Sequence, residues 1–71
     1  VRQDYAQAFA WYEKAAAQDN ARGQFGLGLA YEYGQGVRQN KTTAKKWFGK
    51  ACDKGFQQGC DSYRKLNEAG Y

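Results

Sequence analysis

The sequence predicts an all-α fold in which two antiparallel helix hairpins stack into a short solenoid. Three observations support this prediction. The chain repeats itself after 36 residues, apolar residues recur in each repeat at helical spacing, and the chain lacks proline while being rich in alanine, glutamine and lysine. That composition favours helix over strand. A length of 71 residues allows one small domain.

The internal repeat aligns residues 1–16 with residues 37–52. In one-letter code the two stretches read VRQDYAQAFAWYEKAA and VRQNKTTAKKWFGKAC. Periods of about 20 to 50 residues are typical of stacked supersecondary units. We therefore expect a single domain with one repeat unit over residues 1–36 and a second over residues 37–71. Such arrays usually have about three units or more, so we expect this chain to be a fragment of a longer array.

The first unit reads as a helix over residues 5–18 followed by a helix over residues 21–33. Asp4 and Asn20 precede these segments and can cap them, because their side-chain oxygens accept from the free N–H groups of the opening turn. The first helix carries one apolar stripe: Ala8, Trp11, Tyr12 and Ala15. The apolar surface of the second comes from Phe25, Leu27, Leu29, Ala30 and Tyr33, and Gly34 can end it in a left-handed conformation.

The second unit repeats this organisation with helices over residues 41–53 and 57–67. Asn40 is the predicted cap of the first of these helices, and Gly55 makes the turn between them. The apolar stripe of the first helix is Ala44, Trp47, Phe48 and Ala51. In the last helix we expect Tyr63 and Leu66 to face inward.

The stretch from Leu27 to Cys52, LGLAYEYGQGVRQNKTTAKKWFGKAC, resembles the Sel1-like repeat, a subgroup of the tetratricopeptide-type helical solenoids. The matching positions are Leu27, Gly28, Tyr31, Gly34, Gly36, Val37, Trp47, Phe48, Lys50 and Ala51. Lys41 departs from the family pattern, which prefers an aromatic residue there, and Tyr63-Arg64 replaces a Leu-Gly pair. The resemblance implies a right-handed superhelix and a protein-binding or peptide-binding scaffold whose first helices line a concave groove.

The only two cysteines, Cys52 and Cys60, flank the predicted turn at Gly55. In one continuous helix their Cα atoms would lie about 12 Å apart, which is too far for a disulfide, but a turn at Gly55 folds them toward each other. The alternative to a disulfide is that both thiols are unpaired. A metal site is disfavoured because the chain has no histidine, and a redox pair would more typically have two intervening residues.

The family resemblance also implies a disulfide between Cys52 and Cys60. The cysteine-rich Sel1-like proteins of bacteria carry a Cys-x7-Cys pair that bridges the two helices of each repeat. In the first unit Ala16 and Gln24 occupy the equivalent positions. A structural disulfide favours an oxidising compartment, so we expect a periplasmic or secreted bacterial protein.

The sequence offers little for catalysis, and we expect no enzyme activity, cofactor or metal. Without histidine and with scattered carboxylates, no acid–base constellation is evident. Ser62 and Lys65 match the S-x-x-K motif of penicillin-recognising enzymes, but those enzymes require further catalytic elements that this sequence lacks. Because some cysteine-rich Sel1-like relatives bind or slowly hydrolyse β-lactams, a secreted protein that binds or weakly hydrolyses β-lactam or cell-wall substrates is the alternative.

The charge is uneven along the chain. Residues 1–36 carry three basic and four acidic side chains, a net charge of −1, whereas residues 37–71 carry eight and three, a net charge of +5. A possible basic patch on the third helix consists of Lys41, Lys46, Lys50 and Lys54. It is either a solvated face or a binding strip for an acidic partner. Nucleic acid is disfavoured as a ligand, because no groove-reading motif accompanies the charge.

The best functional hypothesis is therefore a non-catalytic scaffold that binds a protein or peptide, with an acidic partner as one option. By resemblance, the candidate residues of its concave surface are Gln7, Phe9, Glu13, Lys45 and Gly49. A further alternative is a purely structural segment of a longer array. No apolar run reaches the roughly 18 residues of a membrane span.

Overall fold

The computed structural model describes residues 4–71, which form four helices. Helix α1 spans Tyr5–Ala17, α2 spans Ala21–Tyr33, α3 spans Lys41–Asp53 and α4 spans Gln57–Glu68. The predicted helices are confirmed, with α1 one residue shorter and α4 one residue longer than expected. Of the repeat alignment, Val1, Arg2 and Gln3 lie outside the described residues.

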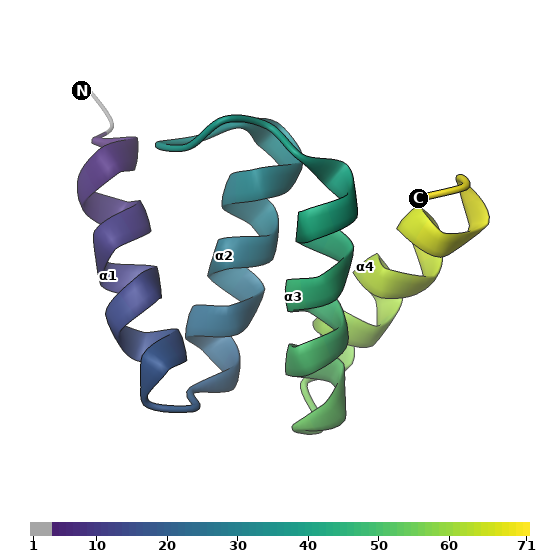
Figure 1. Ribbon diagram of the computed structural model, residues 1–71. Helices are drawn as coiled ribbons and strands as arrows, with labels where there is room; N and C mark the ends of the chain where they lie inside the picture. Colours follow the sequence, from purple (N-terminus) through teal and green to yellow (C-terminus); the bar gives the residue numbers. More distant parts are fainter. Residues whose placement is uncertain (1–3) are drawn as a thin grey trace.

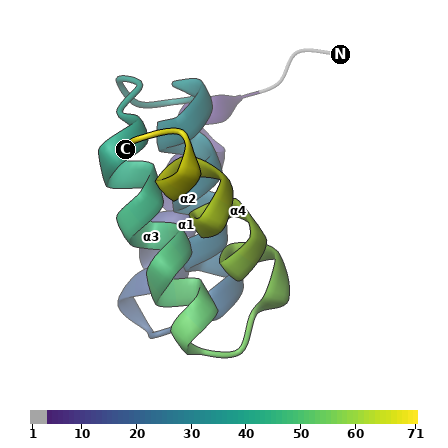
Figure 2. The ribbon, with the colours of Figure 1, turned by 90° about the vertical axis from the view of Figure 1, so that its right-hand side faces the viewer.

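The helices pack in chain order, α1 on α2, α2 on α3 and α3 on α4 (Figure 1). The turns within the two hairpins lie at one end of the molecule, and the connection from α2 to α3 lies at the other. Helix α4 crosses α3 at a clear tilt (Figure 2). This arrangement is the predicted stack of two helix hairpins. No helix has more than 13 residues, and none in the described part of the chain could cross a bilayer.

The predicted helix caps are present. The side chain of Asp4 accepts from the N–H of Gln7, that of Asn20 from Gly23, and that of Asn40 from Thr43, at distances of 3.0–3.1 Å. Each cap satisfies one of the free donors of the opening turn. At the other end of α2, Gly34 adopts a left-handed conformation with φ of 68°.

The core lies where the two hairpins meet. It consists of Ala44, Phe48 and Leu66, with Phe25, Leu29 and Tyr31 packed against it. Phe48 is fully buried. Its ring lies directly against α2 at Gly28, where a Cβ atom would come within 2.4 Å of the Phe48 Cε1 atom. The glycine therefore lets the two hairpins approach closely.

The expectation that Tyr63 faces inward was wrong. Tyr63 is 39% exposed, because it lies on the side of α4 that crosses α3 near Gly49 and no further helix covers it. On α1, Trp11 is 58% exposed and no residue is buried, because α2 is the main helix against which α1 packs. Its repeat equivalent, Trp47, is half-buried because α2 precedes α3 in the stack.

Candidate functional site

The first helices of the two hairpins, α1 and α3, border a groove whose floor is α2. We call this hollow of about 180 Å³ the α1–α3 groove. Its lining residues are Glu13, Ala16, Ala17, Leu27, Tyr31 and Trp47. The small alanine side chains of α1 leave the hollow open, whereas the larger side chains come from α2 and α3.

The floor of the α1–α3 groove is largely apolar. Leu27 is buried, and Tyr31 is half-buried. The ring of Phe9, on α1, meets the Tyr31 ring edge to face, with centroids 5.7 Å apart. This aromatic contact extends the apolar surface from the groove along α1.

Charged side chains stand at the rim. The Lys50 ammonium lies 5.0 Å from the centroid of the Trp47 ring, a cation–π contact that holds the positive charge beside the groove. Glu13 is exposed on the opposite wall. An apolar floor between one acidic and one basic wall can orient an extended chain that carries its own charges.

A polar hollow of about 300 Å³ lies near the hairpin turns, and Lys50 lines it together with Asp19, Gln24, Asp53 and Lys54. Lys54 donates to Asp19 across the two hairpins. This hydrogen bond is the main reason that the pKa of Asp19 lies below its ordinary value. The pair joins the α1–α2 turn to the C-terminal end of α3.

The structure separates the candidate residues of the concave surface into two groups. Glu13 lines the α1–α3 groove, Phe9 packs on its floor residue Tyr31, and Gln7 is exposed on α1. Lys45 and Gly49 instead contact α4. The Lys45 ammonium donates to Asn67 Oδ1 at 3.2 Å and to the Tyr71 carbonyl at 2.6 Å.

Gly49 faces the same helix, since a Cβ atom there would lie 3.2 Å from the Tyr63 ring. The groove residues that the sequence reasoning missed are Ala16, Ala17, Leu27, Tyr31 and Trp47. Leu27, Tyr31 and Trp47 are all residues of the repeat motif, so the motif was the available signal for them.

The four lysines of the possible basic patch do not share one environment. Lys41 lies 5.6 Å from the ring centroid of Tyr71, Lys50 lies over Trp47, and Lys54 pairs with Asp19. Lys46 is exposed. Of these four lysines, Lys50 is the one that contacts a lining residue of the α1–α3 groove, Trp47.

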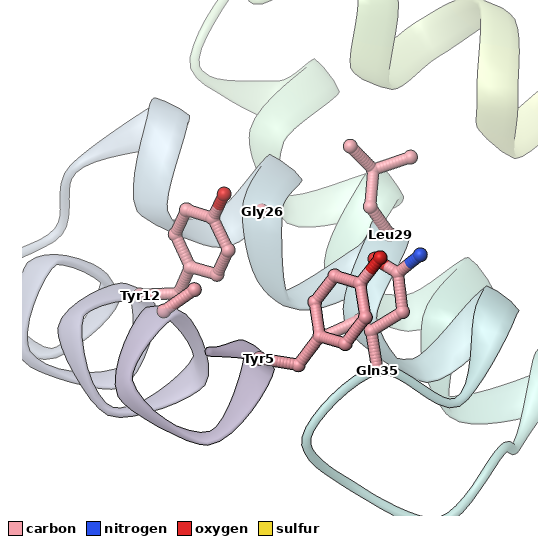
Figure 3. Close-up of a pocket in the computed structure, with 7 residues that line it drawn as sticks. Tyr5, Tyr12, Gly26, Leu29 and Gln35 are labelled. Carbon is pink, nitrogen blue, oxygen red and sulfur yellow. The ribbon is translucent and has the colours of Figure 1, made fainter. Parts of the chain in front are cut away.

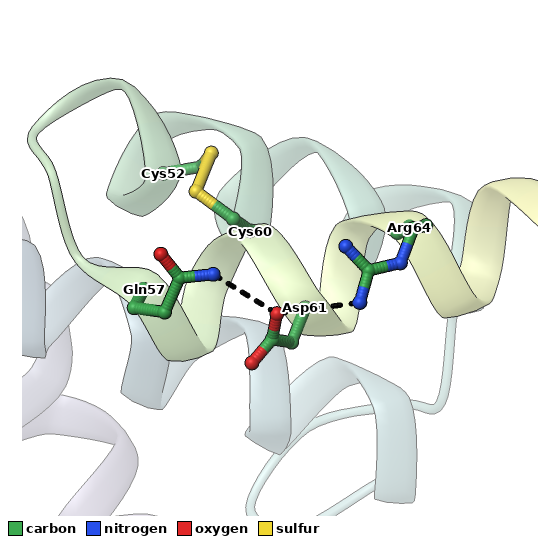
Figure 4. Close-up of a disulfide and its surroundings, with 5 residues drawn as sticks. All are labelled: Cys52, Gln57, Cys60, Asp61 and Arg64. Carbon is green, nitrogen blue, oxygen red and sulfur yellow. Dashed lines mark hydrogen bonds and ion pairs between the residues drawn. A yellow bond between two sulfur atoms is a disulfide. The ribbon is translucent and has the colours of Figure 1, made fainter.

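The predicted disulfide is present and connects α3 to α4 (Figure 4). The Cα atoms of Cys52 and Cys60 are 4.5 Å apart. Gly55, with φ of 87°, makes the turn between them. On α4, Asp61 accepts from Gln57 and pairs with Arg64 beside the disulfide. Neither cysteine is free for nucleophilic or metal chemistry.

The residues of the S-x-x-K motif both lie on α4, with Ser62 half-buried and Lys65 exposed. No hydrogen bond between their side chains is formed within residues 4–71. The same part of the chain has no group of three or more histidine, cysteine, aspartate or glutamate residues arranged to hold a metal ion.

Comparison with known proteins gives a family but no activity. The chain is 53% identical over 32 residues to an uncharacterized protein from Haemophilus influenzae, a match that covers 45% of this chain and 62% of that protein. No solved structure matches. The family model of the Sel1 repeat matches residues 1–20 and 21–56. With its two stacked helix hairpins, the chain belongs to the Sel1 repeat family.

Proposed function

We propose that this protein is a non-catalytic scaffold that binds an extended segment of a partner protein in the α1–α3 groove. The observation that carries the proposal is the half-buried Trp47 above the apolar floor of Leu27 and Tyr31. Aromatic side chains that border a preformed hollow are typical anchors of protein interfaces. Helical repeat arrays use such extended concave surfaces to bind their partners.

The proposed segment is acidic where it meets α3. Lys50 stands beside Trp47, and Lys46 lies one turn earlier on the same helix. The second repeat unit also carries the basic excess of the chain. A partner segment with a carboxylate near Lys50 and an apolar side chain against Trp47 would match both the lysine charge and the tryptophan ring. The charge should affect the association rate and the register of the segment more than its affinity.

We further propose an oxidising location, periplasmic or secreted, in a bacterium. The Cys52–Cys60 disulfide supports this proposal, because stable structural disulfides are rare in the reducing cytosol.

Selection of peptides from a random library displayed on phage tests the scaffold function. We expect the selected peptides to combine acidic and apolar residues and to compete with one another for one site. Their affinity should fall at least about tenfold with Trp47→Ala, as is usual for an aromatic interface anchor, and less with Lys50→Gln. Lys65→Gln, an exposed lysine on α4, is the matched control. Selected peptides that bind the Trp47→Ala variant equally well would refute this site.

The absence of catalysis is a separate part of the proposal. We expect no turnover of the chromogenic β-lactam nitrocefin by the wild-type protein. Hydrolysis that disappears with Ser62→Ala would replace the scaffold function with the β-lactam alternative.

A further inference from the structure

We propose that the protein has a second binding site, on the other side of α2, that takes a small aromatic acid. Two hollows adjoin along the seam between α1 and α2 and share Tyr12, Gly26 and Leu29, so we treat them as one seam pocket. The larger hollow, of about 380 Å³, extends to Phe56 and Gln58 at the start of α4. The smaller one, of about 120 Å³, extends to Tyr5 and Gln35 (Figure 3).

The Tyr12 ring lines the seam pocket and packs closely against α2 at Gly26. A Cβ atom at Gly26 would come within 2.4 Å of the Tyr12 ring, so the glycine provides the space for that ring. Trp11 meets the Tyr12 ring edge to face, with centroids 5.7 Å apart. On the far side of the hollow, the rings of Phe25 and Phe56 lie 5.2 Å apart. Four aromatic side chains thus line one hollow.

The rings favour a flat apolar ligand. Aromatic groups stack or meet edge to face with gains beyond the apolar area they bury. Trp11 is 58% exposed, so part of this surface is accessible as the structure stands. A volume of about 380 Å³ lies at the small end of the usual range for small-molecule sites, about 300–1,000 Å³. It suits a ligand with one or two rings.

The polar groups of the larger hollow favour a negative charge on that ligand. Arg22 and Gln58 line it, and no aspartate or glutamate does. Neither of the two ion pairs within residues 4–71 involves Arg22. The guanidinium offers planar, paired N–H donors that match a carboxylate, and the Gln58 amide can donate as well. A cationic ligand would meet the Arg22 charge and is disfavoured.

The seam pocket is distinct from the α1–α3 groove. Leu29 belongs to the seam pocket and Leu27 to the groove. Residues two positions apart in a helix point about 200° apart around its axis, so these two side chains lie on opposite sides of α2. One tryptophan lines each site, Trp11 at the seam pocket and Trp47 at the groove. The chain has no other tryptophan.

The two tryptophans allow a direct test by NMR with 2-naphthoate as the probe. In the ¹⁵N-labelled protein, we expect 2-naphthoate to shift the indole N–H signal of Trp11 and to leave that of Trp47 unchanged. The Trp47→Phe variant assigns the two signals. The neutral 2-naphthylmethanol should bind about fivefold more weakly than 2-naphthoate, as expected for one exposed charge-assisted contact, and 2-naphthylmethylamine more weakly still.

Arg22→Gln tests the source of that preference. We expect this variant to bind 2-naphthoate and 2-naphthylmethanol equally, with an unchanged thermal unfolding midpoint because Arg22 is exposed. Arg64→Gln, an exposed arginine on α4, should keep the preference. A Trp11 signal that does not move, an equal response to all three probes, or a preference that survives Arg22→Gln would overturn the proposal. Because Trp47 lines the α1–α3 groove and Trp11 lines the seam pocket, binding in the groove would shift the Trp47 signal instead, so the two sites are distinguished.

Discussion

Gly28 and Gly49 both lie near the middle of a helix, but their surroundings differ. A Cβ atom at Gly28 would clash at 2.4 Å with the fully buried Phe48 ring. At Gly49 it would lie 3.2 Å from Tyr63, whose exposed ring can move aside. The helix propensity of alanine favours both substitutions by about 0.8–1 kcal/mol. Forcing a methyl group into a close-packed contact costs about 1–3 kcal/mol.

We therefore expect Gly28→Ala to lower the free energy of unfolding by up to about 2 kcal/mol. Gly49→Ala should leave that free energy unchanged or raise it slightly. Urea unfolding followed by circular dichroism measures both. Equal effects of the two substitutions would show that the Gly28 contact with Phe48 does not limit the approach of the hairpins.

Asp19 provides a pH-dependent contact between the hairpins. Its pKa is lowered, chiefly by the hydrogen bond from Lys54. A group whose pKa is lower in the folded than in the unfolded state stabilises the fold above its unfolded pKa, here near 3.8, and loses this effect as the pH falls through the folded value. We expect Asp19→Asn to lower the unfolding temperature at pH 7.

Asparagine suits this test because Asp19 has φ of 66°, a conformation that asparagine also tolerates. The difference in unfolding temperature between wild type and variant should shrink as the pH falls below 3.8. In a Lys54→Gln background, Asp19→Asn should have little effect. A difference that persists at pH 2 would show that the Asp19–Lys54 pair is not its source.

At the scale of the helices, the two hairpins have the same internal packing but only one has a disulfide. A Cβ atom at Gly23 would come within 2.6 Å of Ala15 Cβ, and one at Gly59 within 2.8 Å of Ala51 Cβ. Both hairpins therefore close through the same glycine–alanine contact. In the second hairpin, the residues that directly follow this alanine and this glycine are Cys52 and Cys60. In the first hairpin, the equivalent residues are Ala16 and Gln24.

We accordingly expect the double variant Ala16→Cys, Gln24→Cys to form a second disulfide. Closing a loop of about nine residues is worth roughly 2.5 kcal/mol in the loop-entropy model, less any strain. Intact mass without reductant should show four fewer hydrogens than the reduced protein, and the unfolding temperature should rise. Free thiols at positions 16 and 24 under oxidising conditions would contradict the equivalence of the hairpins.

The features that the sequence predicted well are local to one helix or one turn. Asp4, Asn20 and Asn40 were identified as caps because a cap depends on residues three positions away. Trp11 and Trp47 show what local patterns miss. They hold the same place in the repeat, yet only Trp47 has a preceding hairpin to cover it.

Local sequence patterns likewise predicted only part of the candidate site. Glu13 lines the α1–α3 groove because it lies on α1, one of the two helices that border it. Leu27 and Tyr31 were missed as groove residues because they belong to a second helix, and their exposure depends on how far α1 and α3 stand apart. Lys45 contacts α4 because that helix crosses α3 at a tilt, which no pattern within α3 specifies.

For the whole molecule, the burial is uneven in a way that predicts uneven stability. Helix α2 holds six buried residues and lies between α1 and α3, whereas α1 has none. Helix α4 buries only Gly59 and Leu66 but is tied to α3 by the disulfide. Segments with few buried contacts open at lower free energy than the rest of a protein. Helix α1 should therefore open without unfolding the other three helices.

Hydrogen exchange of the backbone amides measures this hierarchy. We expect amides in the middle of α2 and α3 to exchange only by global unfolding, and those of α1 to exchange faster through local opening. Reduction of the Cys52–Cys60 bond should speed exchange in α4 while leaving α1 unchanged, because the disulfide restrains only the second hairpin. Protection in α1 equal to that in α2 would mean that the four helices unfold as one unit. The exposed Trp11 would then rest on a helix as stable as the core.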